Sequence, residues 1–151
     1  MKEIKKTFEA ENVSAISVGK IEELNQFQLD LGNETVIPGK IFGGSAVKAT
    51  GAEFSFQSFA PGTETGFLHT HKTHEELYFF ISGNGEFQVD GNVFSVGEGS
   101  IVRVATSGVR SVRNNGNSPL IMLCVQYKEG SFTDEDRTDG MISQNEVKWL
   151  S

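Results

Sequence analysis

The sequence predicts an all-β fold, a β-sandwich or small barrel, from its composition and from the spacing of its apolar segments. The chain has 151 residues, among them 17 glycines, 12 phenylalanines and only 3 prolines. Phenylalanine favours the pleated surface of a strand, and glycine supplies the positive φ angles of tight turns. Short apolar or alternating segments also recur at regular spacing between turn signals, which is typical of antiparallel sheets.

The clearest strand signals lie in the middle of the chain. Residues 52–60 alternate polar with apolar side chains and end at the turn signal Pro61-Gly62. The pair Asp90-Gly91 separates two short apolar runs and favours a hairpin. The expected strands are 52–60, 76–81, 86–89, 93–96, 101–104, 109–113 and 120–127.

The two ends of the chain give weaker signals. Residues 21–27 are compatible with one or two helical turns, so at most a short helix is expected near the amino terminus. Turn signals at 38–40 and 43–45 leave room for short extra strands before the main series. The acidic segment after Tyr127 shows no clear apolar period, so a solvated tail, a lid and an arm across a partner subunit all stay open.

Length and charge limit the classes of protein. A chain of 151 residues fits a single domain, residues 1–151. With 20 acidic against 13 basic residues and a net charge of -7, we expect neither nucleic acid nor a membrane as a partner. The sequence has no secretory signal or membrane-spanning run, and its single cysteine, Cys124, suits a reducing compartment. We therefore expect a cytoplasmic protein.

All three histidines fall within six positions, as His69, His71 and His74. Imidazole and carboxylate groups are ligands of divalent transition metals. On a strand, residues two apart point to one face, so His69 and His71 can reach the same ion. If the chain turns at residues 72–75 and returns antiparallel, Glu76 lies opposite His71 and shares its face. The pattern therefore predicts a metal site made by His69, His71 and Glu76.

Neighbouring residues extend this candidate site. Tyr78 and Phe80 follow on the Glu76 face, where they are expected to form an apolar wall that limits solvent. His74 lies in the expected connection, where histidines are most often merely exposed, and it is kept only as an additional candidate ligand.

These residues resemble the first motif of the cupin superfamily: glycine, five residues, His-x-His, three or four residues, glutamate, six residues, glycine. His69, His71, Glu76 and Gly83 match this pattern, whereas Gly62 lies one position before the place of the leading glycine. The resemblance covers about residues 50–127. It implies a double-stranded β-helix, a jelly-roll-like barrel of two antiparallel sheets with the metal inside, and a homodimer that pairs or exchanges terminal strands.

The second cupin motif is less complete. Its pattern is glycine, five residues, Pro-x-Gly, two residues, histidine, three residues, asparagine, and its histidine is usually the fourth metal ligand. Aligned on Gly108 and Asn115, the chain has Ser111 at the histidine and Ser100 at the first glycine, with Gly99 adjacent. A serine hydroxyl is a poor ligand for metals that favour imidazole, so the four-ligand set is not expected.

Three consequences stay open. The three residues of the first motif bind a metal alone, or a substitute ligand completes the site, or the pocket binds metal weakly and recognises a ligand by hydrogen bonds and aromatic walls. The candidate substitutes are His74, Gln57, Cys124 and Gln126, although Cys124 is more simply explained as buried filler.

Two arginines also fall on expected strands, Arg103 and Arg110. An inward arginine would clamp a carboxylate or phosphate, but strand arginines usually lie on the solvated face, and we expect that here. Arg110 precedes Ser111, so the two side chains should point to opposite faces.

The leading hypothesis is a metal-dependent cupin enzyme, an oxygenase, isomerase or lyase acting on a small polar metabolite with Fe, Mn, Ni or Zn. The alternative, motivated by Ser111, is a non-catalytic cupin that binds or senses a small molecule with a degenerate metal site. The fold cannot choose between these activities.

Overall fold

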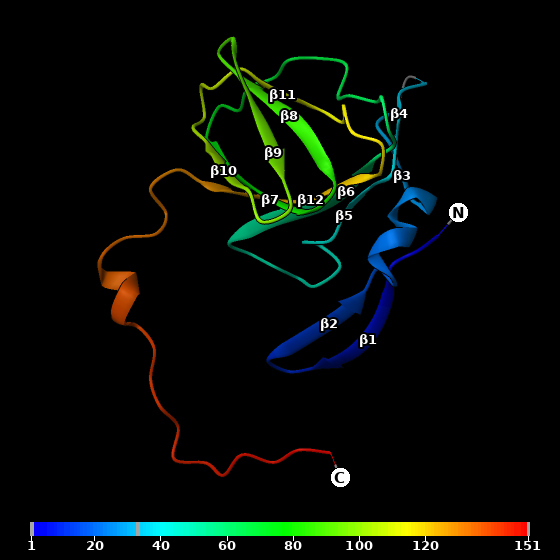
Figure 1. Ribbon diagram of the computed structural model, residues 1–151. Coiled ribbons are helices and arrows are strands. Elements are labelled where there is room, and N and C mark those ends of the chain that lie inside the picture. The colour runs from blue at the N-terminus through cyan, green and yellow to red at the C-terminus, as the bar shows by residue number, and fades with distance from the viewer. Residues whose placement is uncertain (1, 33, 151) are drawn as a thin grey trace.

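The structure, a computed structural model, describes residues 2–32 and 34–150 and is almost entirely β (Figure 1). Its strands are β1 (Lys5–Ala10), β2 (Val13–Ser17), β3 (Gln28–Asp30), β4 (Val36–Pro38), β5 (Lys40–Phe42), β6 (Ala52–Phe59), β7 (His74–Ser82), β8 (Asn84–Val89), β9 (Asn92–Gly97), β10 (Ile101–Val104), β11 (Arg110–Arg113) and β12 (Leu120–Lys128). The all-β prediction is confirmed, and each expected strand is present. Along the described ranges, no helix has the length and apolar character needed to span a membrane.

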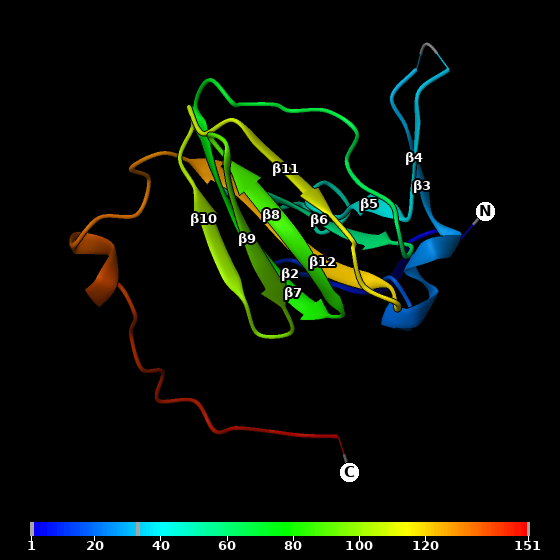
Figure 2. The same cartoon turned by 45° about the horizontal axis from the view of Figure 1, so that its top comes forward.

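Two antiparallel sheets form the body of the molecule. The larger has the order β10-β7-β12-β6-β5 and the smaller the order β11-β8-β9. The smaller sheet lies across one face of the larger (Figure 2). Side chains alternate between the two faces of a strand, so every second residue of β6, β7 and β12 points between the sheets. The main core lies there: Phe59, Tyr78, Phe80, Phe87, Val96, Val104, Val112, Leu120, Met122 and Cys124.

The amino-terminal segment covers the outer face of the larger sheet. The expected short helix is present as the 3-10 helix η1 (Ile21–Gln26). Leu24 and Phe27 are fully or almost fully buried against Ile121, and partly buried side chains of β5, β6 and β7 surround them. The expected extra strands also exist, since β1 pairs with β2 and β3 with β4 as separate hairpins. The β3–β4 hairpin rises beside one end of the barrel.

The carboxyl segment leaves the barrel after β12 and runs away from the β3–β4 hairpin (Figure 1). It contains the second 3-10 helix, η2 (Glu135–Thr138), and has no buried residue in that helix. Its large apolar side chains are 65% exposed or more: Phe132, Met141, Ile142, Val147, Trp149 and Leu150. The segment is therefore not placed as a lid, while the tail and the arm across a partner both remain compatible with it.

The expected hairpin around the histidines is wrong. β7 begins at His74, and its two edges are taken by β10 and β12. The segment before it therefore pairs elsewhere: His69 exchanges two backbone hydrogen bonds with Arg110, and the His71 amide donates to the Thr106 carbonyl at 3.0 Å. His69 and His71 thus extend the edge of the smaller sheet and face Glu76 across the barrel interior.

Candidate metal centre and cavity

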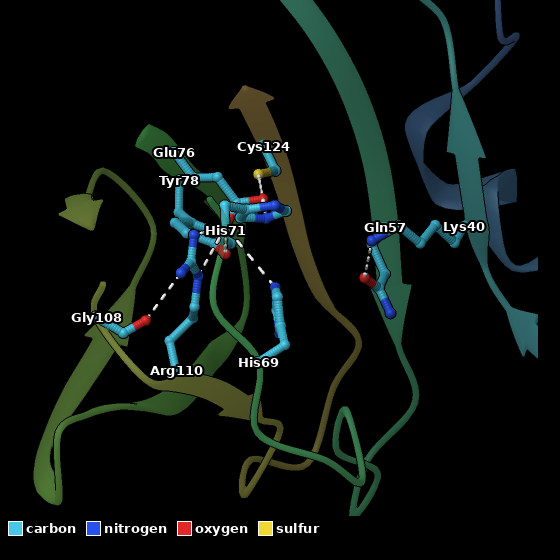
Figure 3. A network of polar contacts seen from close by, with 9 residues as sticks. All are labelled: Lys40, Gln57, His69, His71, Glu76, Tyr78, Gly108, Arg110 and Cys124. Atoms are coloured by element: carbon cyan, nitrogen blue, oxygen red, sulfur yellow. Dashed lines mark hydrogen bonds and ion pairs between the residues drawn. The ribbon is translucent and has the colours of Figure 1, made fainter. Parts of the chain in front are cut away.

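A cavity of about 640 Å³ lies between the two sheets. Its walls come from β3 and β4, from the inner faces of the barrel strands and from the connection before β7. Most of these walls are apolar, but several polar side chains lie close together at one place in the cavity. Figure 3 shows them together: His69, His71, Glu76, Tyr78, Arg110 and Cys124.

The structure brings the three expected metal ligands together. His69, His71 and Glu76 each offer a ligand atom, and these atoms all lie within 4.8 Å of one another. His71 Nε2 is 3.1 Å from Glu76 Oε1, and His69 Nε2 is 3.9 Å from Glu76 Oε2. They come from the connection before β7 and from β7 itself, so two parts of the fold must meet to form the group.

The two imidazoles are open toward a ligand. His71 Nε2 and His69 Nδ1 are buried and have no hydrogen-bond partner. His71 Nε2 is close to Glu76 Oε1, but the two atoms do not have the geometry of a hydrogen bond. Burial lowers the pKa of His69, more than the Glu76 charge raises it. A neutral imidazole is the form that coordinates a metal.

Glu76 is held as a carboxylate. Its side chain is 3% exposed, and it accepts hydrogen bonds from Arg110 and from the Tyr78 hydroxyl. Burial alone would raise the pKa of Glu76, but the hydrogen bonds from Tyr78 and Arg110 outweigh it and bring the pKa to about 2. Burial raises the pKa of Tyr78 far above its ordinary value, so Tyr78 remains a hydrogen-bond donor at neutral pH. Tyr78 is therefore more than the apolar wall expected from the sequence.

Arg110 occupies the interior, and the expectation that it faces solvent is wrong. The residue is 0% exposed. Nε and Nη2 donate to Glu76 Oε2 at 2.9 and 2.7 Å, and Nη1 donates to the Gly108 carbonyl at 2.8 Å. A buried guanidinium is tolerated because it is paired with Glu76 and hydrogen bonded.

This placement corrects the alignment of the second motif by one residue. Asn114, not Asn115, is buried, and its Nδ2 donates to the carbonyls of Phe59 and Ser118 at 2.8 Å each. Counting back from Asn114 puts Arg110 at the position of the fourth metal ligand and Gly99 at the first glycine.

Ser111 is therefore not the residue at the fourth ligand position. On β11 it alternates with the buried Arg110 and Val112, so its side chain points to the outer face, where it also borders a groove with Gln88 and Val93. Ser111 is nevertheless also among the residues that line the cavity.

The other candidate residues lie around the cluster or outside it. His74 is exposed at the start of β7 and does not line the cavity, although its ring centroid is 6.2 Å from that of His71. Phe80 is buried in the core against Phe87, with ring centroids 6.2 Å apart, and is not a lining residue. Cys124 Sγ lies 3.5 Å from Glu76 Oε1, and burial raises the pKa of its thiol. Gln57 and Gln126 also line the cavity, and Gln126 on β12 lies directly opposite Glu76 on β7.

The donor set fits a divalent metal with three protein ligands rather than four. Two imidazoles and one carboxylate oxygen, Glu76 Oε1, face one another, whereas Glu76 Oε2 is taken by Arg110 and Tyr78. Hydrogen bonding of a ligating carboxylate by its neighbours is common at metal centres. The positive charge of Arg110, however, would repel a metal cation bound at this site.

Known proteins share this fold and part of this sequence. The family model described as "Cupin domain" matches residues 55–126. A solved cupin protein from Bacteroides fragilis is 30% identical, covers 76% of this chain and 94% of its own, and superposes with a TM-score of 0.66. An uncharacterized protein of Methanocaldococcus jannaschii is 30% identical over 80 residues, which are 53% of this chain and 64% of that protein.

A third relative, an oxalate-binding protein of Thermotoga maritima, is 29% identical over 72 residues, 48% of this chain and 59% of that protein. The chain thus spans less than two thirds of either curated relative. The family match lies over the strands that surround the His-x-His and glutamate motif, and the solved cupin protein covers 76% of this chain. The chain belongs to the cupin superfamily.

Proposed function

We propose that this chain is a metal-dependent cupin enzyme in which His69, His71 and Glu76 hold a divalent transition metal beside a small metabolite in the cavity. The observation that carries the proposal is the convergence of three ligand atoms within 4.8 Å, with the buried His71 Nε2 lacking a hydrogen-bond partner. Such donors suit Fe, Mn, Ni or Zn. A metal bound there would polarise a carbonyl or enolate oxygen of the metabolite, as in oxygenases, isomerases and lyases.

The surrounding residues would orient the ligands and leave room for the metabolite. Tyr78 and Arg110 fix the Glu76 carboxylate through Oε2, so that Oε1 stays directed toward the histidines. Because Arg110 stands at the position of a fourth protein ligand, a metal held by the three residues would have coordination positions free for water or the metabolite. The apolar walls restrict water around the site.

The direct test is metal analysis of protein purified without a histidine tag, together with thermal unfolding in added Fe²⁺, Mn²⁺, Ni²⁺ or Zn²⁺. We expect His69→Ala to abolish the bound metal and the increase in melting temperature. His74→Ala is the matched control, because His74 belongs to the same cluster in sequence but lies outside the cavity. A protein that binds none of these ions, or a His74→Ala variant that loses them equally, would overturn the proposal.

One observation favours a second function, a cupin that binds or senses a small molecule without metal. The Arg110 guanidinium already neutralises Glu76 inside the barrel. Arg110→His tests this candidate, since it restores a four-ligand set. If the natural chain binds no metal and folded Arg110→His gains it tightly, the metal-free candidate is supported. If both bind one ion, the enzyme proposal stands.

We also propose that the chain is one domain, acts in the cytoplasm as a homodimer, and has no nucleic-acid partner. The net charge of -7 supports the last point, because it repels a phosphate backbone. The exposed apolar side chains of the carboxyl segment support a dimer in which this segment lies on the partner. Light scattering of the full chain and of a chain ending at residue 130 tests the dimer, with a monomeric full chain as the contrary result.

A further inference from the structure

A lysine from the amino-terminal part of the chain points into the same cavity. Lys40 begins β5, which pairs with β6 at the edge of the larger sheet, and it lies directly opposite Gln57. Directly opposed residues share a face, so the partly buried Lys40 follows the inward Gln57. Its Nζ donates to Gln57 Oε1 at 3.4 Å, a long hydrogen bond. Figure 3 shows this pair apart from the histidine cluster, and all of these residues line the same cavity.

A glycine fixes the position of Lys40. Gly39 has a φ of +71°, and a Cβ there would lie 2.3 Å from the Ser58 carbonyl oxygen. The Gly39 amide donates to the Phe27 carbonyl at 2.8 Å, and the Ser58 amide donates to the Gly39 carbonyl at 2.9 Å. The turn before β5 is thus tied to β6 on one side and to the segment after η1 on the other, which directs the next side chain inward.

Lys40 is the unbalanced charge of the cavity. None of the ion pairs found among residues 2–32 and 34–150 includes Lys40. The other interior charges, Glu76 and Arg110, neutralise each other, and Glu64 is exposed at the cavity rim. Burial lowers the pKa of Lys40, more than Cys124 and Glu76 raise it, as expected for a desolvated cation without a close partner. A bound anion would remove this penalty.

The remaining walls are apolar. Aromatic and aliphatic side chains from the barrel, from the β3–β4 hairpin and from the connection before β7 line the same cavity as Lys40 and the histidines: Leu29, Val36, Phe42, Phe59, Phe67 and Met122. A volume of about 640 Å³ is typical of a cavity for a metabolite with a sizeable apolar body, and far exceeds what a two-carbon dianion such as oxalate fills.

We propose that this cavity binds an organic acid with an apolar body, whose carboxylate is held by Lys40 and Gln57 while the body lies along the aromatic wall toward His69 and His71. This inference rests on the proposed function for its choice of cavity, and it names the class of ligand. Lys40 supplies the charge, and the Gln57 amide supplies a second donor in a fixed position.

The test uses hexanoate as the probe, with acetate and the neutral hexanamide for comparison, in saturation-transfer NMR on the full chain. We expect hexanoate to bind more tightly than either. Lys40→Met should weaken hexanoate about tenfold and leave hexanamide unchanged, the effect of removing a hydrogen bond to a charged group. Lys40→Arg should retain most of the binding. Lys48→Met is the matched control, because Lys48 is exposed and paired with Glu9 on the surface.

Two outcomes would overturn the inference: no preference for hexanoate over hexanamide, or hexanoate binding that Lys40→Met leaves unchanged. If the metal held the carboxylate instead, Lys40→Met would leave hexanoate binding unchanged and His69→Ala would abolish it. Metal content separates the two proposals, since Lys40→Met should keep the metal and bind hexanoate about tenfold more weakly, whereas His69→Ala should lose the metal and keep the binding of hexanoate. Melting curves show that each variant is folded.

Discussion

Adjacent residues on β7, Glu75 and Glu76, each bind one arginine and one tyrosine, but on opposite faces of the strand. Glu75 accepts from Arg103 Nε at 2.5 Å and from the Tyr127 hydroxyl at 3.2 Å on the outside of the barrel. Glu76 accepts from Arg110 and Tyr78 on the inside. The Arg103 side chain is 56% exposed, and the Arg110 side chain only 1%.

Each cluster joins a buried glutamate to an arginine and a tyrosine, and the main difference is the exposure of the arginine, although Glu76 also contacts Cys124 and His71. On the outside, water can replace any member that is removed, and salt screens the attraction. On the inside, the charged and polar groups take the place of water around one another. Removing one of them therefore leaves a buried charge without a partner. The inner cluster should therefore be much more sensitive to substitution, and it is also the one that shapes the candidate metal centre.

The largest expected effect is that of Arg110→Met. It leaves the Glu76 carboxylate buried with only the Tyr78 hydroxyl and the weakly donating Cys124 thiol, and should lower the free energy of unfolding by about 3–5 kcal/mol. Urea denaturation of metal-free protein measures this loss. The double variant Arg110→Met with Glu76→Gln should be less destabilised than Arg110→Met alone, because the unpaired charge is gone. A loss below about 1 kcal/mol would show that the inner pair behaves like a surface pair.

The next effect is the pH dependence of stability that Glu76 produces. Its pKa is about 2 in the folded chain, below the ordinary value of 4.5. Above pH 4.5 the carboxylate is ionised in both states and its stabilisation is complete. As the pH falls from 4.5 toward 2, the unfolded chain takes up the proton first, so the free energy of unfolding declines.

Urea denaturation across this range measures the decline, and ¹³C NMR of the glutamate carboxyl groups identifies the residue. The pKa of Glu75 is also lowered, by the hydrogen bond from Arg103, but Glu75 should contribute less because its partner is solvated. A Glu76 signal that titrates near pH 4.5 would contradict the prediction.

A smaller effect is expected for the tyrosine hydroxyls. Tyr78→Phe removes a buried donor to the Glu76 carboxylate and should lower the free energy of unfolding by about 1.5–3 kcal/mol. Tyr127→Phe removes the corresponding outer donor and should stay within about 0.5 kcal/mol of the natural chain. Equal losses in the two variants would mean that Tyr127 is as tightly held as Tyr78.

Local patterns were enough to predict the strands and the centre of the site. Period-two alternation and turn residues are properties of a few neighbouring positions, which is why 52–60 and 120–127 were found. The three ligands lie within eight positions, so their residue types indicated the site even though the hairpin predicted for them is wrong. Glu76 meets His71 across the barrel rather than across a turn.

The position of Arg110 depends on information that is not local. Alignments that end at Asn114 and at Asn115 each match two positions of the second motif, and only the burial of Asn114 decides between them. Because side chains alternate along a strand, this single residue of shift exchanges Ser111 for Arg110 inside the barrel. The inward direction of Lys40 is not predictable from the sequence for a similar reason, since a three-residue strand gives no periodicity and the direction follows from pairing with β6.

Arg103→Met, the outer counterpart of Arg110→Met, is expected to have only a small effect and is the most informative control for the comparison. Arg103 and Arg110 both donate through Nε to a β7 glutamate, so the two methionine substitutions remove similar bonds from the two faces. Because Arg103 is mostly exposed, its loss should lower the free energy of unfolding by no more than about 1 kcal/mol. Repeating the urea denaturation in high salt should reduce even this difference, since an exposed pair is screened. If Arg103→Met instead matched Arg110→Met, burial would not explain the sensitivity of the inner cluster, and the attachment of β10 to β7 would have to be its cause.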